Sequence, residues 1–95
     1  MSPLVDLPGK VPPQSLEAER AVLGCVLIEP SVLPRAIELV QPEDFYKEGH
    51  RKIFGAMIRL FERSEPADTL TVTEELRREG SLDEVGGPAT LATLM

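Results

Sequence analysis

The stretch Ser15-Leu-Glu-Ala-Glu-Arg-Ala-Val-Leu-Gly-Cys-Val-Leu-Ile28 decides the fold of this chain of 95 residues. Its second half, residues 21–28, has no polar side chain except that of Cys25. A helix that is apolar on every side is expected to be buried on every side. We therefore predict a helix at the centre of a small helical core, with Ser15 as its N-cap and Glu19 near the positive end of the helix dipole.

The composition is that of one small globular domain with an acidic surface. The net charge is −6, which lowers the expectation of nucleic-acid binding because that binding depends largely on cations that contact phosphates. Cys25 is the only cysteine, so we expect neither a disulfide within the chain nor a cysteine cluster for a metal, and we predict an inert, buried thiol. We find no signal peptide and no apolar run long enough to span a membrane, and we expect a cytoplasmic protein. Arginine outnumbers lysine and asparagine is absent, a weak hint of a heat-adapted source.

The rest of the chain predicts short helices separated by turns. Residues 1–13 are rich in proline and predict an extended, poorly ordered leader, and residues 14–95 predict the helical domain. A second helix is expected from Ser31, its cap, to about residue 40, and residues 41–46 predict one helical turn that inserts Phe45. The fold class is therefore all-α, a compact orthogonal array of five or six short helices.

The third long helix, residues 48–63, shows the clearest amphipathic pattern. We expect five of its side chains to face the core: Ile53, Phe54, Met57, Ile58 and Phe61. The opposite face carries basic residues, among them Arg51, Lys52, Arg59 and Arg63.

Two shorter helices are predicted after this one. Thr71 and Glu74 fit a capping box at the start of a helix that Gly80 ends. Pro88 suits the first turn of a last helix, whose apolar residues are Leu91, Leu94 and Met95. The chain stops within this pattern, and we expect it to be the N-terminal piece of a longer protein.

No catalytic or nucleotide-binding motif is present in the sequence. The pair Gly86-Gly87 is followed by Pro88, which has no N–H, and no lysine follows, so the pattern of a phosphate-binding loop is absent. His50 is the only histidine and is predicted on the buried face of the third helix, where we expect it to tie the helix start to a neighbouring segment. A catalytic or ligand-binding role for His50 stays open at this point, although a general base needs a partner group.

Basic residues offer three interpretations. Arg77 and Arg78 end the helix that follows Thr71, where cations suit the negative end of the dipole. These two arginines and the basic face of residues 48–63 could form a solvated surface, a contact with a protein partner, or part of a DNA-binding helix-turn-helix. The third interpretation is weakened by Glu74 and its acidic neighbours, which would face phosphate oxygens in a DNA groove.

Three blocks of the sequence resemble the N-terminal domain of DnaB-type replicative DNA helicases. The first block is Val11-Pro-Pro-Gln-Ser-Leu-Glu-Ala-Glu-Arg-Ala-Val-Leu-Gly24, and the second is Pro42-Glu-Asp-Phe45 with His50 and Ile53-Phe54. The third block contains Asp68, Thr71-Val72, Leu76, Gly80, Leu82 and Val85-Gly86-Gly87. The chain departs from the family at Thr90, where members often carry an aromatic residue before the leucine.

The resemblance implies a domain that works by presenting surfaces. In the family this domain forms the collar of a hexameric ring that unwinds DNA in the 5′ to 3′ direction, and it recruits primase through the primase C-terminal domain. A helicase loader is a further possible partner. ATP and Mg²⁺ are expected only in the separate motor domain, so this chain is expected to hold no cofactor and to catalyse nothing by itself. Met95 is expected to lie before the helical hairpin through which family members pair.

We take partner-contact residues to be Arg77, Arg78, Thr90, Leu91, Leu94 and Met95. We expect structural roles for Cys25, His50, Thr71, Glu74 and Gly80. The alternatives are a small acidic DNA-binding domain and a small enzyme in which His50 meets a carboxylate in a pocket.

Overall fold

The computed structural model describes residues 15–95, and the regular secondary structure of this part of the chain consists only of helices, as predicted. The elements are α2 (Leu16–Ile28), the 3₁₀ turn η1 (Pro30–Val32), α3 (Leu33–Leu39), the 3₁₀ turn η2 (Pro42–Asp44), α4 (Glu48–Glu62), α5 (Thr69–Arg78) and α6 (Pro88–Leu94). The predicted leader, residues 1–13, lies outside the described residues. None of the helices in residues 15–95 has both the length and the apolar character that crossing a membrane requires.

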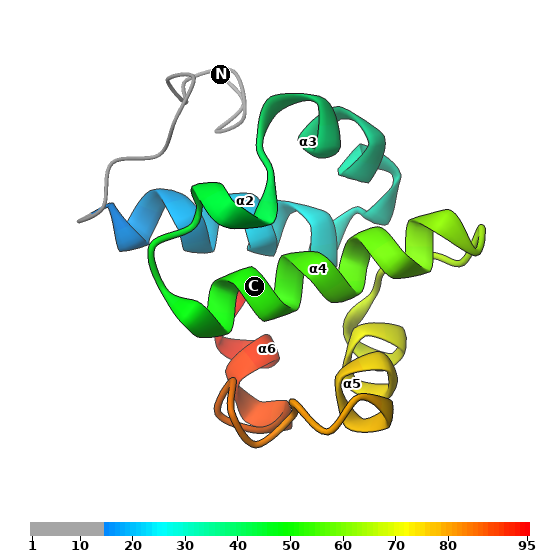
Figure 1. Ribbon diagram of the computed structural model, residues 1–95. Helices are drawn as coiled ribbons and strands as arrows, with labels where there is room; N and C mark the ends of the chain where they lie inside the picture. The colour runs from blue at the N-terminus through cyan, green and yellow to red at the C-terminus, as the bar shows by residue number, and fades with distance from the viewer. Residues whose placement is uncertain (1–14) are drawn as a thin grey trace.

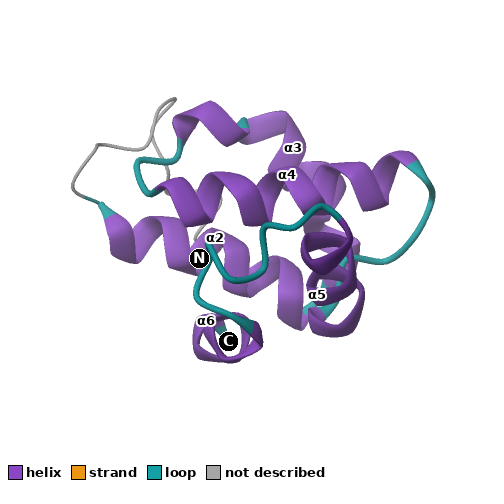
Figure 2. Cartoon of the chain, turned by 60° about the horizontal axis from the view of Figure 1, so that its bottom comes forward, coloured by secondary structure: helices purple, strands orange, loops and turns teal. Residues whose placement is uncertain are grey.

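The two long helices, α2 and α4, lie side by side in the middle of the domain (Figures 1 and 2). Helix α3 covers one side of this pair, and α5 and α6 lie on the other. The core between them consists almost wholly of aliphatic side chains and two phenylalanines. Its fully enclosed members include Val22, Leu23, Val26, Val40, Phe45, Ile53, Phe54, Met57, Leu60, Val72 and Leu76.

The prediction that α2 is buried on every side is correct for most of its surface and wrong for one stripe. Val22 and Val26 are fully buried, because α3, α4 and α6 all contact this helix. Cys25, however, is only partly buried, and Ile28 keeps 65% of its surface exposed. These three helices leave one side of α2 uncovered, so some of the apolar side chains of α2 stay exposed to solvent. Ser15 precedes the helix, but its side chain makes no capping hydrogen bond.

The start of α3 also differs from the prediction. Ser31 lies inside the 3₁₀ turn η1, and this turn runs directly into α3, so Ser31 does not cap the helix. Pro34 lies in the first turn of α3, where its missing N–H leaves no hydrogen bond unmade.

The turn η2 inserts Phe45 into the core, as predicted. Phe45 is fully buried, and its ring centroid lies 5.2 Å from that of Phe54 on α4. The backbone N–H of Gln41 donates to the Asp44 carboxylate over 2.9 Å, which closes the turn. We call residues 45–47, which join η2 to α4, the strap.

Helix α4 buries a slightly different face from the predicted one. Ile53, Phe54 and Met57 are fully buried, but Phe61 is 45% exposed and Leu60 is buried in its place. Helix α5 packs against the side of α4 that carries Leu60.

Helix α5 begins earlier than predicted, at Thr69, and the predicted capping box of Thr71 and Glu74 is wrong. Asp68 is the N-cap: its carboxylate accepts the Thr71 N–H over 2.9 Å, and the Thr71 hydroxyl accepts the Asp68 N–H over 3.0 Å. At the other end Gly80 has φ +76°, and the Ser81 N–H donates to the Leu76 carbonyl. A glycine in the left-handed region closes the helix, in the position that the sequence indicates.

Helix α6 starts at Pro88 after two glycines with positive φ, Gly86 and Gly87. Its carboxyl end lies directly on α2. A Cβ atom on Gly24 would overlap the carbonyl oxygen of Leu94, so the close approach of these helices requires glycine at this position.

Candidate functional site

A buried carboxylate–imidazole pair joins α2 to α4. Glu19 has no exposed surface and His50 is 3% exposed, and the Nδ1 of His50 lies 2.7 Å from Oε1 of Glu19. Glu19 Oε2 also accepts the backbone N–H of Tyr46 over 2.6 Å, and Oε1 accepts the backbone N–H of Lys47 over 3.4 Å. The sequence predicts that His50 ties the helix start to another segment, and the structure identifies that segment as α2.

Glu19 itself was not predicted as the partner of His50. The sequence places it in the first turn of α2 as a favourable charge, whereas the structure uses its carboxylate to bind the strap. His50 therefore does meet a carboxylate, which the enzyme alternative requires, but both side chains are sealed from solvent. A substrate cannot reach either group, and the pair acts as an internal clamp.

A second charged cluster holds α5 against α4. Glu75 on α5 is 5% exposed, and its carboxylate accepts from the Arg63 Nη2 over 2.6 Å and from the Arg59 Nε over 3.0 Å. Arg59 also pairs with Glu79, and Arg63 pairs with Glu65. Hydrogen bonds from Arg63 and then Arg59 lower the pKa of Glu75 from 4.5 to about 2, and the hydrogen bond to Glu75 raises the pKa of Arg63.

These pairs change the interpretation of the basic face of α4. Arg59 and Arg63 both contact Glu75 on α5, and Arg63 also contacts Glu65 in the turn between α4 and α5. Arg51 and Lys52 lie near Glu48. The face is thus largely neutralised by the chain itself.

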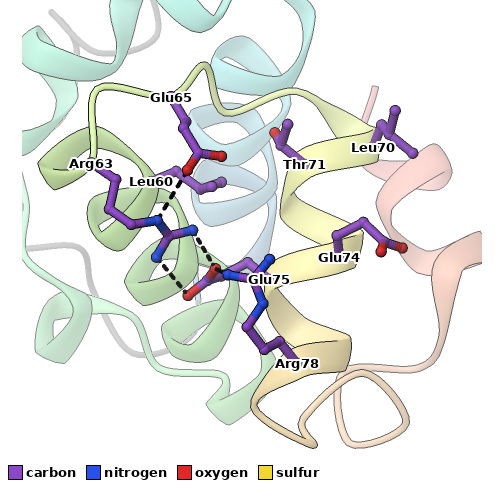
Figure 3. Close-up of a pocket in the computed structure, with 8 residues that line it drawn as sticks. All are labelled: Leu60, Arg63, Glu65, Leu70, Thr71, Glu74, Glu75 and Arg78. Carbon is purple, nitrogen blue, oxygen red and sulfur yellow. Dashed lines mark hydrogen bonds and ion pairs between the residues drawn. The ribbon is translucent and has the colours of Figure 1, made fainter.

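A hollow of about 260 Å³ opens beside this cluster, between the end of α4 and α5 (Figure 3). Leu60, Arg63 and Glu65 line it from the end of α4 and the turn that follows α4. The lining residues from α5 are Leu70, Thr71, Glu74, Glu75 and Arg78. Leu70 is 71% exposed, the largest value among the large apolar side chains of the described residues, which makes this hollow a candidate contact for a partner.

The structure gives no sign of a metal or phosphate site in residues 15–95. No three His, Cys, Asp or Glu side chains of this range are grouped so that they could hold a metal ion. At the glycine pair, the Gly86 N–H donates to the Asp83 carbonyl and the Gly87 N–H donates to the Leu82 carbonyl. The pair therefore forms a tight turn into α6 and not an open cradle of N–H groups.

Comparison with known proteins gives the family. The sequence matches the family described as DnaB-like helicase N terminal domain over residues 11–95. The chain belongs to this family. The resemblance seen in the sequence is thereby confirmed.

The individual relatives agree with this assignment. The chain is 54% identical over 86 residues to "Replicative DNA helicase DnaB" of Rhodothermus marinus, and 51% identical over 85 residues to that of Geobacillus stearothermophilus. Each match covers 90% of this chain but only 9% and 19% of the relative, respectively. A crystal structure of the N-terminal domain of DnaB helicase from Mycobacterium tuberculosis matches with a TM-score of 0.83 and 42% identity, over 87% of this chain and 58% of that one.

This DnaB-like domain leaves only some of the predicted contact residues accessible. Leu91 and Leu94 are 1% and 8% exposed and pack within the domain, so in this structure they offer no free surface. Met95 is 56% exposed and Thr90 is partly buried. Arg77 and Arg78 are exposed on the last turn of α5, where Arg77 pairs with Glu74.

Five exposed large apolar residues of the described range were not predicted as contacts: Leu16, Ile28, Tyr46, Phe61 and Leu70. Leu70 had a signal in the sequence, because it lies on the opposite side of its helix from Val72 and Leu76. Tyr46 had a weaker signal. In an extended chain, successive side chains point to opposite sides, so the residue after the buried Phe45 is expected to face solvent.

Proposed function

We propose that this domain is the non-catalytic interaction and oligomerisation module of a longer, hexameric, ATP-dependent replicative DNA helicase that moves 5′ to 3′. In this proposal it contributes to the collar of the ring and recruits primase at the replication fork, in the cytoplasm. Its partners in this proposal are other helicase subunits, the primase C-terminal domain and a helicase loader. Family membership and the similarity to two replicative DNA helicases support this assignment.

The observation that carries the proposal is the distribution of polar and apolar groups. The titratable side chains that are buried serve internal contacts: Glu19 binds His50 and the strap, and Glu75 binds two arginines. Large apolar side chains lie on the surface instead, with Leu70 71% and Tyr46 61% exposed. Such a surface suits contact with another protein, since aromatic and apolar anchors supply most binding energy.

The nucleotide of the proposed helicase would bind outside this domain. Residues 86–88 lack the lysine and the free N–H groups that hold a triphosphate, so the residues present do not fit ATP and Mg²⁺. We assign both to a separate motor domain of the longer protein.

Direct DNA binding is the alternative function, and the ion pairs weigh against it. Arg59 and Arg63 are engaged by glutamates, and the whole chain carries a charge of −6. A DNA-binding domain would show affinity that falls steeply with salt, as counterions are released from the phosphates.

Sedimentation velocity tests the proposal. The chain alone and a version extended by about fifty residues of its natural sequence are each run with and without the primase C-terminal domain. We expect a faster-sedimenting complex with the primase domain and no shift with single- or double-stranded DNA at moderate salt. ATP turnover by the pure domain, or a shift with DNA alone, would contradict the proposal.

A further inference from the structure

One face of α2 is apolar and open to solvent in the described structure. Ala21 and Cys25 are only partly buried, and Ile28, the last residue of the helix, is 65% exposed. These residues follow one another at spacings of four and three positions, so they lie on one side of the helix. We call Ala21, Cys25 and Ile28 the open face of α2. Apolar surface that a helix leaves uncovered favours a further contact.

Along α2, charged residues border the open face only at its two ends. Glu17 and Arg20 precede Ala21, and Glu29 follows Ile28. All three are exposed, and together they carry no excess of positive charge that would attract phosphates. The middle of the face, residues 21–28, has no charged side chain. The occupant that fits this face is therefore an apolar stretch of polypeptide.

The carboxyl end of α6 lies at the edge of the open face. Gly24 is three positions after Ala21 and four before Ile28, so it neighbours both on the helix surface. The Leu94 carbonyl is in close contact with Gly24, and a Cβ atom built on Gly24 would lie 3.9 Å from the Cα of Met95. Met95 is 56% exposed. Residues that follow Met95 in a longer protein would thus begin beside the open face.

The size of the open face favours a tethered segment over a second copy of the chain. A stable interface between two molecules buries roughly 800 Å² on each partner, which is more than three side chains supply. A segment of the same chain is held at an effective concentration in the millimolar range and avoids most of the cost of association. The distance is also short: Ala21 and Ile28 lie about 10 Å apart along the helix, so about four extended residues cross the face.

We propose that, in the longer protein, the segment that directly follows Met95 covers the open face of α2. Apolar side chains of this segment pack on Ala21, Cys25 and Ile28, and the contact fixes the direction in which the chain leaves the domain. This inference rests on the proposed function, which makes the domain part of a longer helicase. The chain spans only 19% of the relative from Geobacillus stearothermophilus and 58% of the Mycobacterium tuberculosis structure.

The reaction of Cys25 with a maleimide tests the inference, because Cys25 is the only cysteine and lies on the open face. The rate is measured in the chain of 95 residues and in the version extended by natural sequence. We expect the reaction to be about tenfold slower in the extended version, since thiol reactivity follows exposure. The control combines Cys25→Ser with Leu70→Cys, which moves the thiol to an exposed position on α5, and should react equally fast at both lengths.

Thermal melting of Ile28→Ala gives a second measurement. The substitution should lower the melting temperature of the extended version by about 5 °C, because the isoleucine is buried there. In the chain of 95 residues Ile28 is mostly exposed, so the change should be less than half as large.

The outcomes separate this inference from its alternatives. Equal rates of Cys25 labelling at both lengths would overturn it. Slowing that grows with protein concentration would assign the face to a second copy, and slowing that disappears on removal of residues 1–13 would assign it to the predicted leader; either result overturns the proposal. If Cys25 is protected but the extended version does not bind the primase domain, the contact stands and the proposed recruitment of primase is wrong.

Discussion

Replacing Glu75 by glutamine tests the cluster that joins α4 to α5. The carboxylate has a pKa of about 2 in the folded chain, against 4.5 ordinarily. A difference of this size corresponds to at most about 3 kcal/mol of stability at neutral pH. The side chains of Arg63 and Arg59 are 38% and 40% exposed, so solvent screens their attraction, and we expect Glu75→Gln to lower the free energy of unfolding by about 1–2 kcal/mol.

The pH dependence gives this prediction its sharper form. Because the pKa of Glu75 is lowered on folding, its contribution is present above about pH 4.5 and is lost as the pH falls through about 2. Urea unfolding of the original chain and of Glu75→Gln should therefore show a stability gap at pH 6 that shrinks steadily towards pH 2.5. Glu74→Gln is the matched control, since Glu74 is exposed and pairs only with Arg77 in the described structure. A gap that stays constant with pH, or a gap no larger than that of the control, would refute the reasoning.

The remaining predictions concern single contacts of the fold. Gly24→Ala should lower the melting temperature and perturb amide exchange in α6, because the new methyl group overlaps the Leu94 carbonyl. The control Gly55→Ala, which has only the Arg59 side chain nearby, should be neutral or stabilising. Equal effects of the two substitutions would contradict the predicted contact. Glu19→Ala removes the partner of a buried imidazole and should cost about 3–5 kcal/mol by urea unfolding, so a loss below about 1 kcal/mol would show that the clamp is weak. Gly80→Ala should cost about 1 kcal/mol through its φ of +76°, and calorimetric melting measures this directly.

Local patterns in the sequence predicted most helices correctly. The period of apolar residues in residues 48–63 marks α4, and Pro88 marks the start of α6, because both signals act within a few residues. The cap of α5 was misplaced because two overlapping patterns, Asp68 with Thr71 and Thr71 with Glu74, both fit a capping box. Local sequence does not decide between them.

Long-range contacts were less predictable. Glu19 and His50 are 31 residues apart in sequence, and nothing near either residue indicates the other. The same holds for Arg63 and Glu75, which turn a basic face of α4 into an internal contact. The partial burial of Cys25 follows from the number of helices that surround α2, which the apolar sequence of α2 does not reveal. The candidate site was therefore only partly predictable. Arg77, Arg78 and Met95 were predicted and are accessible, whereas Tyr46 and Leu70, which carry only local signals in the sequence, were not predicted.

Chemical-shift mapping of the ¹⁵N-labelled chain tests most directly whether the domain works by presenting a protein-binding surface. Addition of the primase C-terminal domain should shift and broaden the amide signals of one continuous set of exposed residues, while an excess of single-stranded DNA should leave the spectrum unchanged. Shifts produced by DNA in place of the primase domain would contradict the account.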